Sequence, residues 1–405
     1  MSTGTQRRSA WPLNSDAKGR QVYRNGQRNG SETANPEDAG IVRVRTAISK
    51  FLYDIVLINR KLFRAPLFLG QFALGRRFNR QASRAVKRIL LVRLQRLGDL
   101  MMTKPVISAL HEEYPGATID IITASSVRIL QQLFAKEIDN WYSYESSLYQ
   151  PRASARAERA ALRRSLRQYD LVIDFDGDFF TLNVARALKP NRYLSRGLTR
   201  ISEAIHHRER RDAQLELLFM IAGVEWREKE QSGMRTAVRQ RLIEVHPFSG
   251  AGIRDPEPQF WRELIAELQN TFDDYQIMLT GYGKEEPVVA ALAEETRSNV
   301  YADDSDVLHQ RFRQNVALVI CPDTFTMHFA AHLGTPVIAL FGPQSPARYC
   351  DFYPTVHPIY HPVACSPCGY NNFGIDFCPR EKRCLRSITV TEVVQKAEEL
   401  LRDSH

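Results

Sequence analysis

Short runs of apolar residues alternate along most of this chain with longer stretches in which apolar residues recur every three or four positions. The first pattern is typical of strands buried on both faces, and the second of amphipathic helices. Apolar runs predict strands at 87–94, 117–124, 170–178, 241–249, 275–281, 316–324 and 335–343. Helical spacing predicts helices at 100–114, 153–167, 256–270, 284–296, 304–314, 325–333 and 391–401. This alternation predicts an α/β protein with parallel sheets.

The alternation falls into two series, which suggests two domains. A chain of 405 residues is too long for one ordinary domain. We expect one domain at 87–235 and a second at 236–405, each an open parallel sheet with helices on its faces. Ligands of such sheets bind beyond the carboxyl ends of the strands. The chemistry should therefore lie in the loops that follow the strands, in a cleft between the two domains.

Residues 1–86 form an extension with a different composition. The part at 1–40 is rich in Ser, Asn, Gly and Arg, and we expect it to be disordered. The part at 41–80 reads as a basic amphipathic helix, either an anchor on anionic lipid or a helix packed on the protein body or another subunit. Residues 1–90 carry a net charge of +13, and the remaining residues carry −4. We expect the inner membrane surface, and not nucleic acid, as the anionic partner.

Membrane-spanning and secretory segments are not expected. The most apolar stretch, Phe51–Leu74, is interrupted by four charged residues and by Pro66. It falls short of the roughly 18 uncharged apolar residues that a transmembrane helix needs. No apolar core of a signal peptide follows the first residues. We expect a cytoplasmic protein.

The first strand ends in Arg96-Leu97-Gly98-Asp99, just before a helix. Gly98 permits a tight turn there. Asp99 at a helix N-terminus is either a simple N-cap or a general base that takes a proton from a hydroxyl group. The sequence pattern alone leaves both interpretations open.

A second candidate site follows the strand at 316–324, in the sequence PDTFTMH (322–328). Amide groups at a helix start favour an anion. Thr324 and Thr326 add hydroxyl groups, and His328 adds an imidazole one turn later. A diphosphate would fit there without a metal. The alternative is a capped helix with a partly buried histidine.

Further small and basic residues are expected at the same sheet edge. Ser249 and its neighbouring glycines allow close backbone approach, and Arg254 offers a bidentate phosphate donor. Gly342 lies in a turn at the end of the strand at 335–343. No phosphate-binding loop of the form GxxxxGK[ST] and no GxGxxG occurs, which disfavours nucleotide triphosphatases and ordinary dinucleotide dehydrogenases.

All six cysteines lie at Cys321 or later, and four of them stand in the pattern CxxC–x9–CxxxxxC within the loop 350–386. These four are Cys365, Cys368, Cys378 and Cys384. In a cytoplasmic protein they suggest a structural zinc or iron site, or reduced thiols that pack a loop, before they suggest disulfides.

Three stretches resemble glycosyltransferase family 9, the ADP-heptose:lipopolysaccharide heptosyltransferases. Residues 88–124 resemble the first βαβ unit of the family with its Gly-Asp pair. Residues 321–346 resemble its Asp-Thr-Gly-x-x-His and Phe-Gly-Pro signature, and residues 365–393 resemble a cysteine-bearing tail. The resemblance covers about 87–401.

The resemblance implies a GT-B fold, in which two Rossmann-like domains bind the acceptor and the nucleotide-sugar. It implies a metal-independent, inverting transfer with Asp99 as the catalytic base. It places Asp323, Thr324 and His328 at the donor, where we also expect Thr326, Arg254, Ser249 and Gly342. For an anionic lipopolysaccharide core we expect Arg96, Arg163 and Arg196, although basic positions on the predicted helix 153–167 could equally form a solvated face.

The chain departs from the family pattern at two positions. Phe325 replaces the glycine after Asp-Thr, which could narrow the phosphate pocket, and Arg254 stands in for a basic residue that usually precedes Trp-Pro. Two alternatives therefore remain beside a heptosyltransferase. One is a related transferase for another sugar or a protein acceptor, and the other is a non-catalytic scaffold at the membrane.

Overall fold

The computed structural model describes two bodies of secondary structure and leaves several segments undescribed. It describes residues 85–94, 96–143, 160–161, 163–166, 168–177, 181, 184, 188, 190–196, 214–225, 241–281, 286–302, 316–368 and 378–402. The helix expected at 41–80, most of the one expected at 153–167, the one expected at 304–314 and the boundary at 235/236 lie outside the described residues.

The first body is built on a five-stranded parallel sheet. Its strands are β1 (Arg88–Val92), β2 (Thr118–Thr123), β3 (Asn140–Ser143), β4 (Leu171–Asp174) and β5 (Arg192–Ser195), in the order β3-β2-β1-β4-β5. Its helical elements are α2 (Leu97–Met101), α3 (Lys104–Glu113), η2 (Ser125–Phe134) and α7 (Gln214–Ala222).

The second body is built on a six-stranded parallel sheet. Its strands are β6 (Leu242–Val245), β7 (Gln276–Gly281), β8 (Asn299–Ala302), β9 (Leu318–Pro322), β10 (Val337–Phe341) and β11 (Val356–Tyr360), in the order β11-β10-β9-β6-β7-β8. Its helical elements are η3 (Gly252–Arg254), α8 (Pro258–Thr271), α9 (Glu286–Thr296), α11 (Phe325–His332), α12 (Pro346–Tyr349), α14 (Arg383–Arg386) and α15 (Val390–Arg402).

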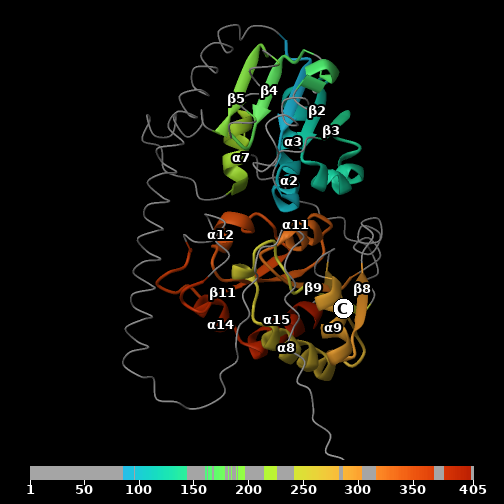
Figure 1. Cartoon of the computed structure of the whole chain (residues 1–405), viewed down its shortest axis with the longest axis vertical. Coiled ribbons are helices and arrows are strands. Elements are labelled where there is room, and N and C mark those ends of the chain that lie inside the picture. Colours follow the sequence, from blue (N-terminus) through green and yellow to red (C-terminus); the bar gives the residue numbers. More distant parts are fainter. Residues whose placement is uncertain are drawn as a thin grey trace, which may run out of the picture.

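Both sheets have the strand order of a doubly wound fold, so the prediction of two parallel α/β domains is confirmed. Each order reverses direction beside its first strand, between β1 and β4 in one sheet and between β6 and β9 in the other. Loops that leave these two positions form the usual ligand crevice of such sheets. Figure 1 shows α2 of the first domain facing α11 of the second.

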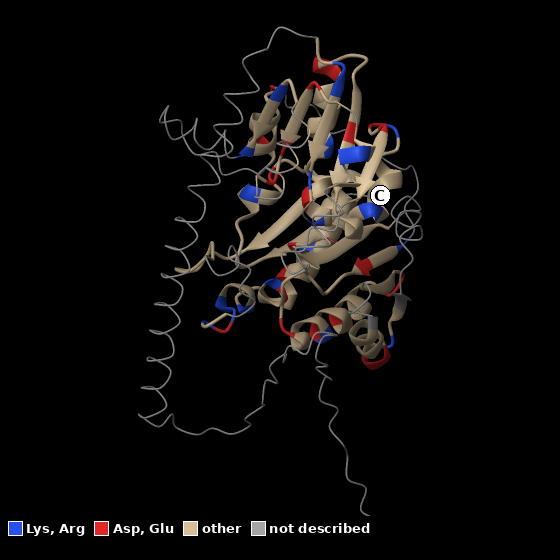
Figure 2. Cartoon of the chain, turned by 45° about the horizontal axis from the view of Figure 1, so that its top comes forward, with Lys and Arg blue, Asp and Glu red and all other residues tan. Residues whose placement is uncertain are grey.

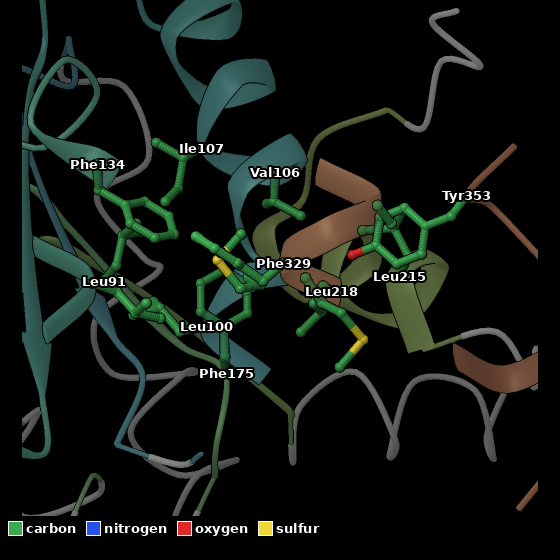
Figure 3. Packing of buried hydrophobic residues seen from close by; sticks show 14 of the residues in the cluster. Leu91, Leu100, Val106, Ile107, Phe134, Phe175, Leu215, Leu218, Phe329 and Tyr353 are labelled. Atoms are coloured by element: carbon green, nitrogen blue, oxygen red, sulfur yellow. The ribbon is translucent and has the colours of Figure 1, made fainter. Parts of the chain in front are cut away.

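The apolar strands are buried as their sequences predict, and the core continues from one domain into the other. Figure 3 shows Phe329 of α11 close to Leu100 of α2 and Val106 of α3. The three side chains belong to one buried cluster, which also includes Leu215 of α7. Burial of apolar area at about 25 cal/mol per Å² stabilises this contact between the domains.

The helix expected at 100–114 is wrong in its extent. The structure has two helices, α2 and α3, separated after Met101. Pro105 lies in the first turn of α3, where its missing backbone N–H costs little, whereas inside one long helix it would break a hydrogen bond. Because α2 begins at Leu97 with Arg96 as its N-cap, Asp99 lies inside the first turn and is not the N-cap.

Other boundaries also differ from the predicted ones. The helix expected from Pro256 begins at Pro258, and the strand at 335–343 is not the last, because β11 follows it. Strands β3, β5 and β8 were not predicted, because each is short and contains polar residues (NWYS, RYLS and NVYA) that interrupt an apolar run. Thr389 lies just before α15, and its Oγ1 accepts the backbone N–H of Glu392 at 3.2 Å.

Charged residues of both signs are interspersed over the two domains (Figure 2). Among the described residues, no helix is both long and apolar enough to cross a membrane.

Candidate active site between the two domains

A buried guanidinium group holds Asp99 at the end of β1. The Arg93 side chain is only 1% exposed, and its Nη2 donates to Asp99 Oδ1 at 3.2 Å. Its Nε and Nη2 also donate to the backbone carbonyl of Asp99, at 3.3 and 3.2 Å. The Asp99 carboxylate is 23% exposed, so it remains accessible from outside the protein. A carboxylate fixed in this way can accept a proton from a bound hydroxyl group.

The other side of Arg93 is held by a carboxylate from the neighbouring strand. Arg93 Nη1 donates to Asp176 Oδ1 at 3.0 Å, and the backbone N–H of Leu94 donates to Asp176 Oδ2. The Asp176 side chain is fully buried. Asp174, two residues earlier, accepts the backbone N–H groups of Asp176 and Gly177, which fixes this loop after β4. The β1 and β4 loops are thus joined at the switch point of the first sheet.

The two domains touch directly at Gly98. A Cβ atom at this position would lie 2.9 Å from Cδ2 of His328 and 3.7 Å from the Cα of Phe325. His328 is itself buried within the second domain. The absence of a side chain at Gly98 therefore lets α2 and α11 approach closely and brings Asp99 next to the start of α11.

We predict that Gly98→Ala destabilises the protein by about 1–3 kcal/mol, because the new methyl group must displace a buried ring. Urea denaturation measures this change. Gly250→Ala is the matched control, since the nearest atoms to its added Cβ would lie at an ordinary 3.7 and 3.8 Å. Equal stability of the two variants would contradict the close contact between α2 and α11.

Two guanidinium groups from different domains meet beside Gly250. A Cβ atom on Gly250 would lie 3.7 Å from Nη2 of Arg254 and 3.8 Å from Nη1 of Arg96. Arg254 Nη1 donates to the backbone carbonyl of Asp323 at 2.9 Å and to its Oδ2 at 3.2 Å. Within the part of the chain that the structure describes, Arg96 has no ion-pair partner. The predicted acceptor residue Arg96 thus lies beside the predicted donor residue Arg254.

His328 lies within reach of the carboxylates of both domains. Burial lowers its pKa below the ordinary value, while the charges of Asp323 and Asp99 oppose that shift. Its Nδ1 lies 3.4 Å from the hydroxyl oxygen of Tyr353. The lowered pKa favours the neutral imidazole, which can offer a hydrogen bond near Asp99 and Asp323.

The hydroxyl groups expected at the donor lie at the start of α11 and in the loop after β6. Thr324 is the N-cap residue of α11, and no hydrogen bond of its side chain caps the helix. Thr326 Oγ1 is buried without a hydrogen-bond partner among the described residues. Ser249 is tied to its own loop, because its Oγ donates to the carbonyl of Ala251 at 2.6 Å. Thr324 and Thr326 therefore keep hydroxyl groups for a ligand, whereas Ser249 shapes the loop.

Phe325 does not point away from the core. Its ring stacks on Phe329, with the centroids 5.4 Å apart and the planes inclined by 30°. Phe325 belongs to the partly buried residues packed on the core shared by the two domains. The departure from the family glycine thus adds packing between α11 and α2.

Three other predicted site residues lie elsewhere. A Cβ atom on Gly342 would lie 2.5 Å from Cγ of Leu385 and 3.2 Å from Sγ of Cys384, so this glycine is needed for packing against α14. Arg163 is exposed on a short helical stretch, and Arg196 is half-buried directly after β5. No described contact joins Arg163 or Arg196 to Asp99.

The four cysteines of the loop are thiols in the structure. Burial raises the pKa of Cys384 to about 11, and the neighbouring Cys378 and Cys365 add to the shift. These three sulfur atoms are therefore close enough to interact electrostatically. Even so, the described residues contain no group of three or more metal ligands with a suitable arrangement, and the fit of a metal is incomplete there.

Three residues of this candidate site were not predicted from the sequence. Arg93 looked like part of an apolar strand, and Asp176 is separated from it by more than 80 residues. The sequence DFDGD at 174–178 forms the second half of the strand predicted at 170–178, and its three carboxylates could have indicated a polar loop at the same sheet edge. Tyr349 also lies near Asp323 and Asp99. Burial raises the pKa of its hydroxyl group, and the charges of these two carboxylates raise it further.

Comparisons with known proteins point to a single family. The family model described as "Glycosyltransferase family 9 (heptosyltransferase)" matches residues 256–369. Lipopolysaccharide heptosyltransferase 1 of Salmonella typhimurium is 26% identical over 304 residues, which cover 64% of this chain and 89% of that protein.

Two solved structures share the fold. A family 9 glycosyltransferase from Veillonella parvula matches with a TM-score of 0.60 at 17% identity, covering 78% of this chain and 97% of its own. The ADP-heptose lipopolysaccharide heptosyltransferase II of E. coli matches with a TM-score of 0.57 at 18% identity, covering 78% and 99%. The expected GT-B architecture is confirmed. The chain is therefore a glycosyltransferase, and its sequence and fold are similar to those of family 9, the heptosyltransferase family.

Proposed function

We propose that this protein transfers a heptose from ADP-heptose to the core of a lipopolysaccharide acceptor, with Asp99 as the general base. One observation carries the proposal. Asp99 and Arg96 of the first domain meet His328, Asp323 and Arg254 of the second domain where α2 contacts α11. This juxtaposition combines a proton acceptor with a group of anion-binding donors.

The donor site would be formed by the second domain with help from Arg96. Thr324 is the N-cap of α11, and Arg254 contacts the backbone of the preceding residue, Asp323, so the first amides of α11 and the Thr324 hydroxyl group would bind an anion beside Arg254. The guanidinium groups of Arg254 and Arg96 lie beside the same glycine and can hold the two phosphates from opposite sides. ADP-heptose is the proposed donor because it appears in the name of the E. coli enzyme that shares the fold.

The proposed reaction is a single displacement. Asp99 takes the proton of an acceptor hydroxyl group, whose oxygen attacks the anomeric carbon of the sugar. The bond between that carbon and the diphosphate oxygen breaks, and ADP leaves with the bonding electrons. Attack from the face opposite to ADP inverts the anomeric configuration. Arg254, Arg96 and the α11 amides would stabilise the charge that develops on the diphosphate.

The acceptor would lie over the first domain, where Arg196 and Arg163 supply positive charge for the phosphorylated core sugars of a lipopolysaccharide. Contact with the inner face of the cytoplasmic membrane through residues 41–80 would bring the enzyme to this lipid-linked substrate. This placement also agrees with the relative named lipopolysaccharide heptosyltransferase 1.

A structural zinc or iron ion at the cysteines is a separate part of the proposal. Cys378 and Cys365 both raise the pKa of Cys384, and Cys368 follows Cys365 by three positions. Four thiolates would fill the coordination sphere and leave no open position for a reacting group. Full titration of these four thiols in native protein that contains no metal would contradict this site.

Nucleotide binding tests the proposed donor. We expect ADP, but not UDP or GDP, to raise the stability of the protein by about 2.7 kcal/mol at 100 times its Kd. Arg254→Met should abolish most of this effect, because it removes a guanidinium group from the phosphate site. The control is Arg262→Met, which alters an ion pair on the exposed side of α8. If UDP or GDP stabilises the protein and ADP does not, the donor carries that nucleotide in place of ADP. If none of the three stabilises the protein, the proposed donor site is contradicted.

A further inference from the structure

Residues 365–368 and 378–385, here called the cysteine segment, contact the loop after β6 through one lysine, Lys382. Lys382 directly follows Glu381 and precedes α14. Its backbone N–H donates to Sγ of Cys378 at 3.2 Å, and its Nζ donates to the carbonyl oxygen of Asp255 at 2.9 Å. The same Nζ lies 3.9 Å from Oε1 of Glu257. Lys382 thus connects the cysteine segment to the loop after β6, which lies 127 positions earlier in the sequence.

The carbonyl group that Lys382 holds belongs to the residue after Arg254. The short helix η3 ends there, with the N–H of Asp255 donating to the carbonyl of Gly252 at 3.1 Å. Arg254 in turn donates to the backbone carbonyl and the side chain of Asp323. The contacts therefore run without a break from Cys378 through Lys382 and the η3 turn to Arg254 and the start of α11.

The cysteine segment also holds the second loop of the same sheet edge. The N–H of Cys368 donates to the carbonyl of Pro343 at 2.6 Å, and the hydroxyl group of Ser366 donates to the carbonyl of Gly342. Leu385 of α14 fills the space left by the missing side chain of Gly342. The loops after β6 and β10, whose strands flank β9, are thus both in contact with residues 366–368 and 382–385.

The backbone conformation at Lys382 supports a specific role for its side chain. Glu381 and Lys382 have φ angles of 53° and 51°, in the left-handed region that residues with a side chain seldom adopt. Glycine would adopt this conformation at lower cost. It would also lack the ammonium group that reaches Asp255. The position therefore combines a strained backbone with a long cationic side chain that spans two loops.

We propose that Lys382 is a positioning residue that sets the affinity for the nucleotide donor by fixing the η3 turn and, through it, the guanidinium group of Arg254. The inference rests on the proposed function, because it assumes that Arg254 binds the donor phosphates. It assigns to the cysteine segment a role as a support of the donor site. The affinity for the acceptor, which would bind to the first domain, should not depend on Lys382.

The test compares Lys382→Met with Lys382→Arg by calorimetric titration with ADP. We expect the methionine variant to bind ADP about tenfold more weakly, and the arginine variant to recover most of the affinity because it keeps a charged donor of similar reach. In the transfer assay the KM of the donor should rise by a similar factor, while the KM of the acceptor and kcat stay within about twofold. The control is Lys396→Met, which removes an exposed ion pair on α15.

A double-mutant cycle shows whether the effect passes through Arg254. In the Arg254→Met background, Lys382→Met should cause no further loss of ADP affinity. An equal loss in both backgrounds would overturn the proposal, because it would indicate general damage to the fold. Unchanged ADP affinity of Lys382→Met in otherwise native protein would overturn it as well.

Hydrogen exchange separates a failure of this inference from a failure of the proposed donor. If the native protein binds none of ADP, UDP and GDP, the proposed donor site is wrong. The attachment of the loop is still measurable, because the amides of residues 252–257 should exchange at least tenfold faster in Lys382→Met than in Lys396→Met. Unchanged exchange rates there would overturn the role of Lys382 independently of any ligand.

Discussion

Replacing Asp99 by asparagine should lower the rate of sugar transfer by about 10²–10⁴-fold, the usual contribution of a general base. The asparagine keeps the size of the side chain and can still accept a hydrogen bond from Arg93 Nη2, but it cannot take a proton from the acceptor. The helix α2 and its contact with His328 should persist, since neither uses the charge of Asp99. Binding of ADP should therefore stay within about twofold of the native value.

Initial rates with saturating donor and acceptor, measured beside the ADP affinity, check this prediction. Asp273→Asn provides the control, because Asp273 is an exposed carboxylate in the turn after α8, in the second domain. A rate for Asp99→Asn within about threefold of the native rate would exclude Asp99 as the base. A parallel loss of ADP affinity would instead indicate that the exchange had disturbed the contact between the domains.

Replacing Arg93 by methionine should destabilise the protein by about 3–5 kcal/mol, the usual cost of removing one partner from a buried ion pair. Its partner Asp176 is fully buried and would lose the guanidinium group that lies 3.0 Å from its carboxylate. The methionine cannot donate to the Asp99 carbonyl either, so the first turn of α2 would lose its anchor to β1. We expect a large drop in the urea midpoint and reduced transfer in the folded fraction.

A second substitution distinguishes loss of the ion pair from loss of packing. Asp176→Asn keeps an oxygen that can accept the N–H of Leu94 but removes the buried charge. The double variant Arg93→Met, Asp176→Asn should therefore be more stable than Arg93→Met alone. If Arg93→Met costs less than about 1 kcal/mol, or if the second change gives no recovery, the buried ion pair is not what holds Asp99.

The arrangement of the elements and the placement of the main candidate residues at one sheet edge were predictable from the sequence, because each depends on local pattern. The strands β1, β6 and β9 are apolar runs, and the residues that follow them reach the cleft wherever a parallel sheet is doubly wound. Asp99, Arg254 and Asp323 each follow one of these strands. Their meeting is a consequence of topology, and the topology follows from the alternation of strands and helices.

The contacts that fix these residues were not predictable, because they join distant parts of the chain. Arg93 pairs with Asp176 only because β4 lies beside β1. Lys382 reaches Asp255 only because residues 378–385 lie beside the loop after β6. No spacing in the sequence relates the members of either pair.

Two residues assigned to the site from local pattern, Gly342 and Arg96, have a different role or neighbour in the structure. Gly342 lies at the expected sheet edge, but its missing side chain serves the close approach of Leu385. Arg96, assigned to the acceptor because it lies in the first domain, stands next to the donor loop at Gly250. Local residue type suggested the polarity of the cleft, whereas the assignment of each residue to one substrate needed the contact between the domains.

Mass spectrometry of the acceptor tests the central claim most directly. A lipopolysaccharide precursor that lacks core heptose would be incubated with ADP-heptose and the native protein, and in parallel with Asp99→Asn. We predict that the acceptor gains the mass of one heptosyl residue with native protein, that ADP appears in equal amount, and that the variant gives almost no product. An acceptor of unchanged mass in the presence of native protein that binds ADP would contradict the proposed transfer.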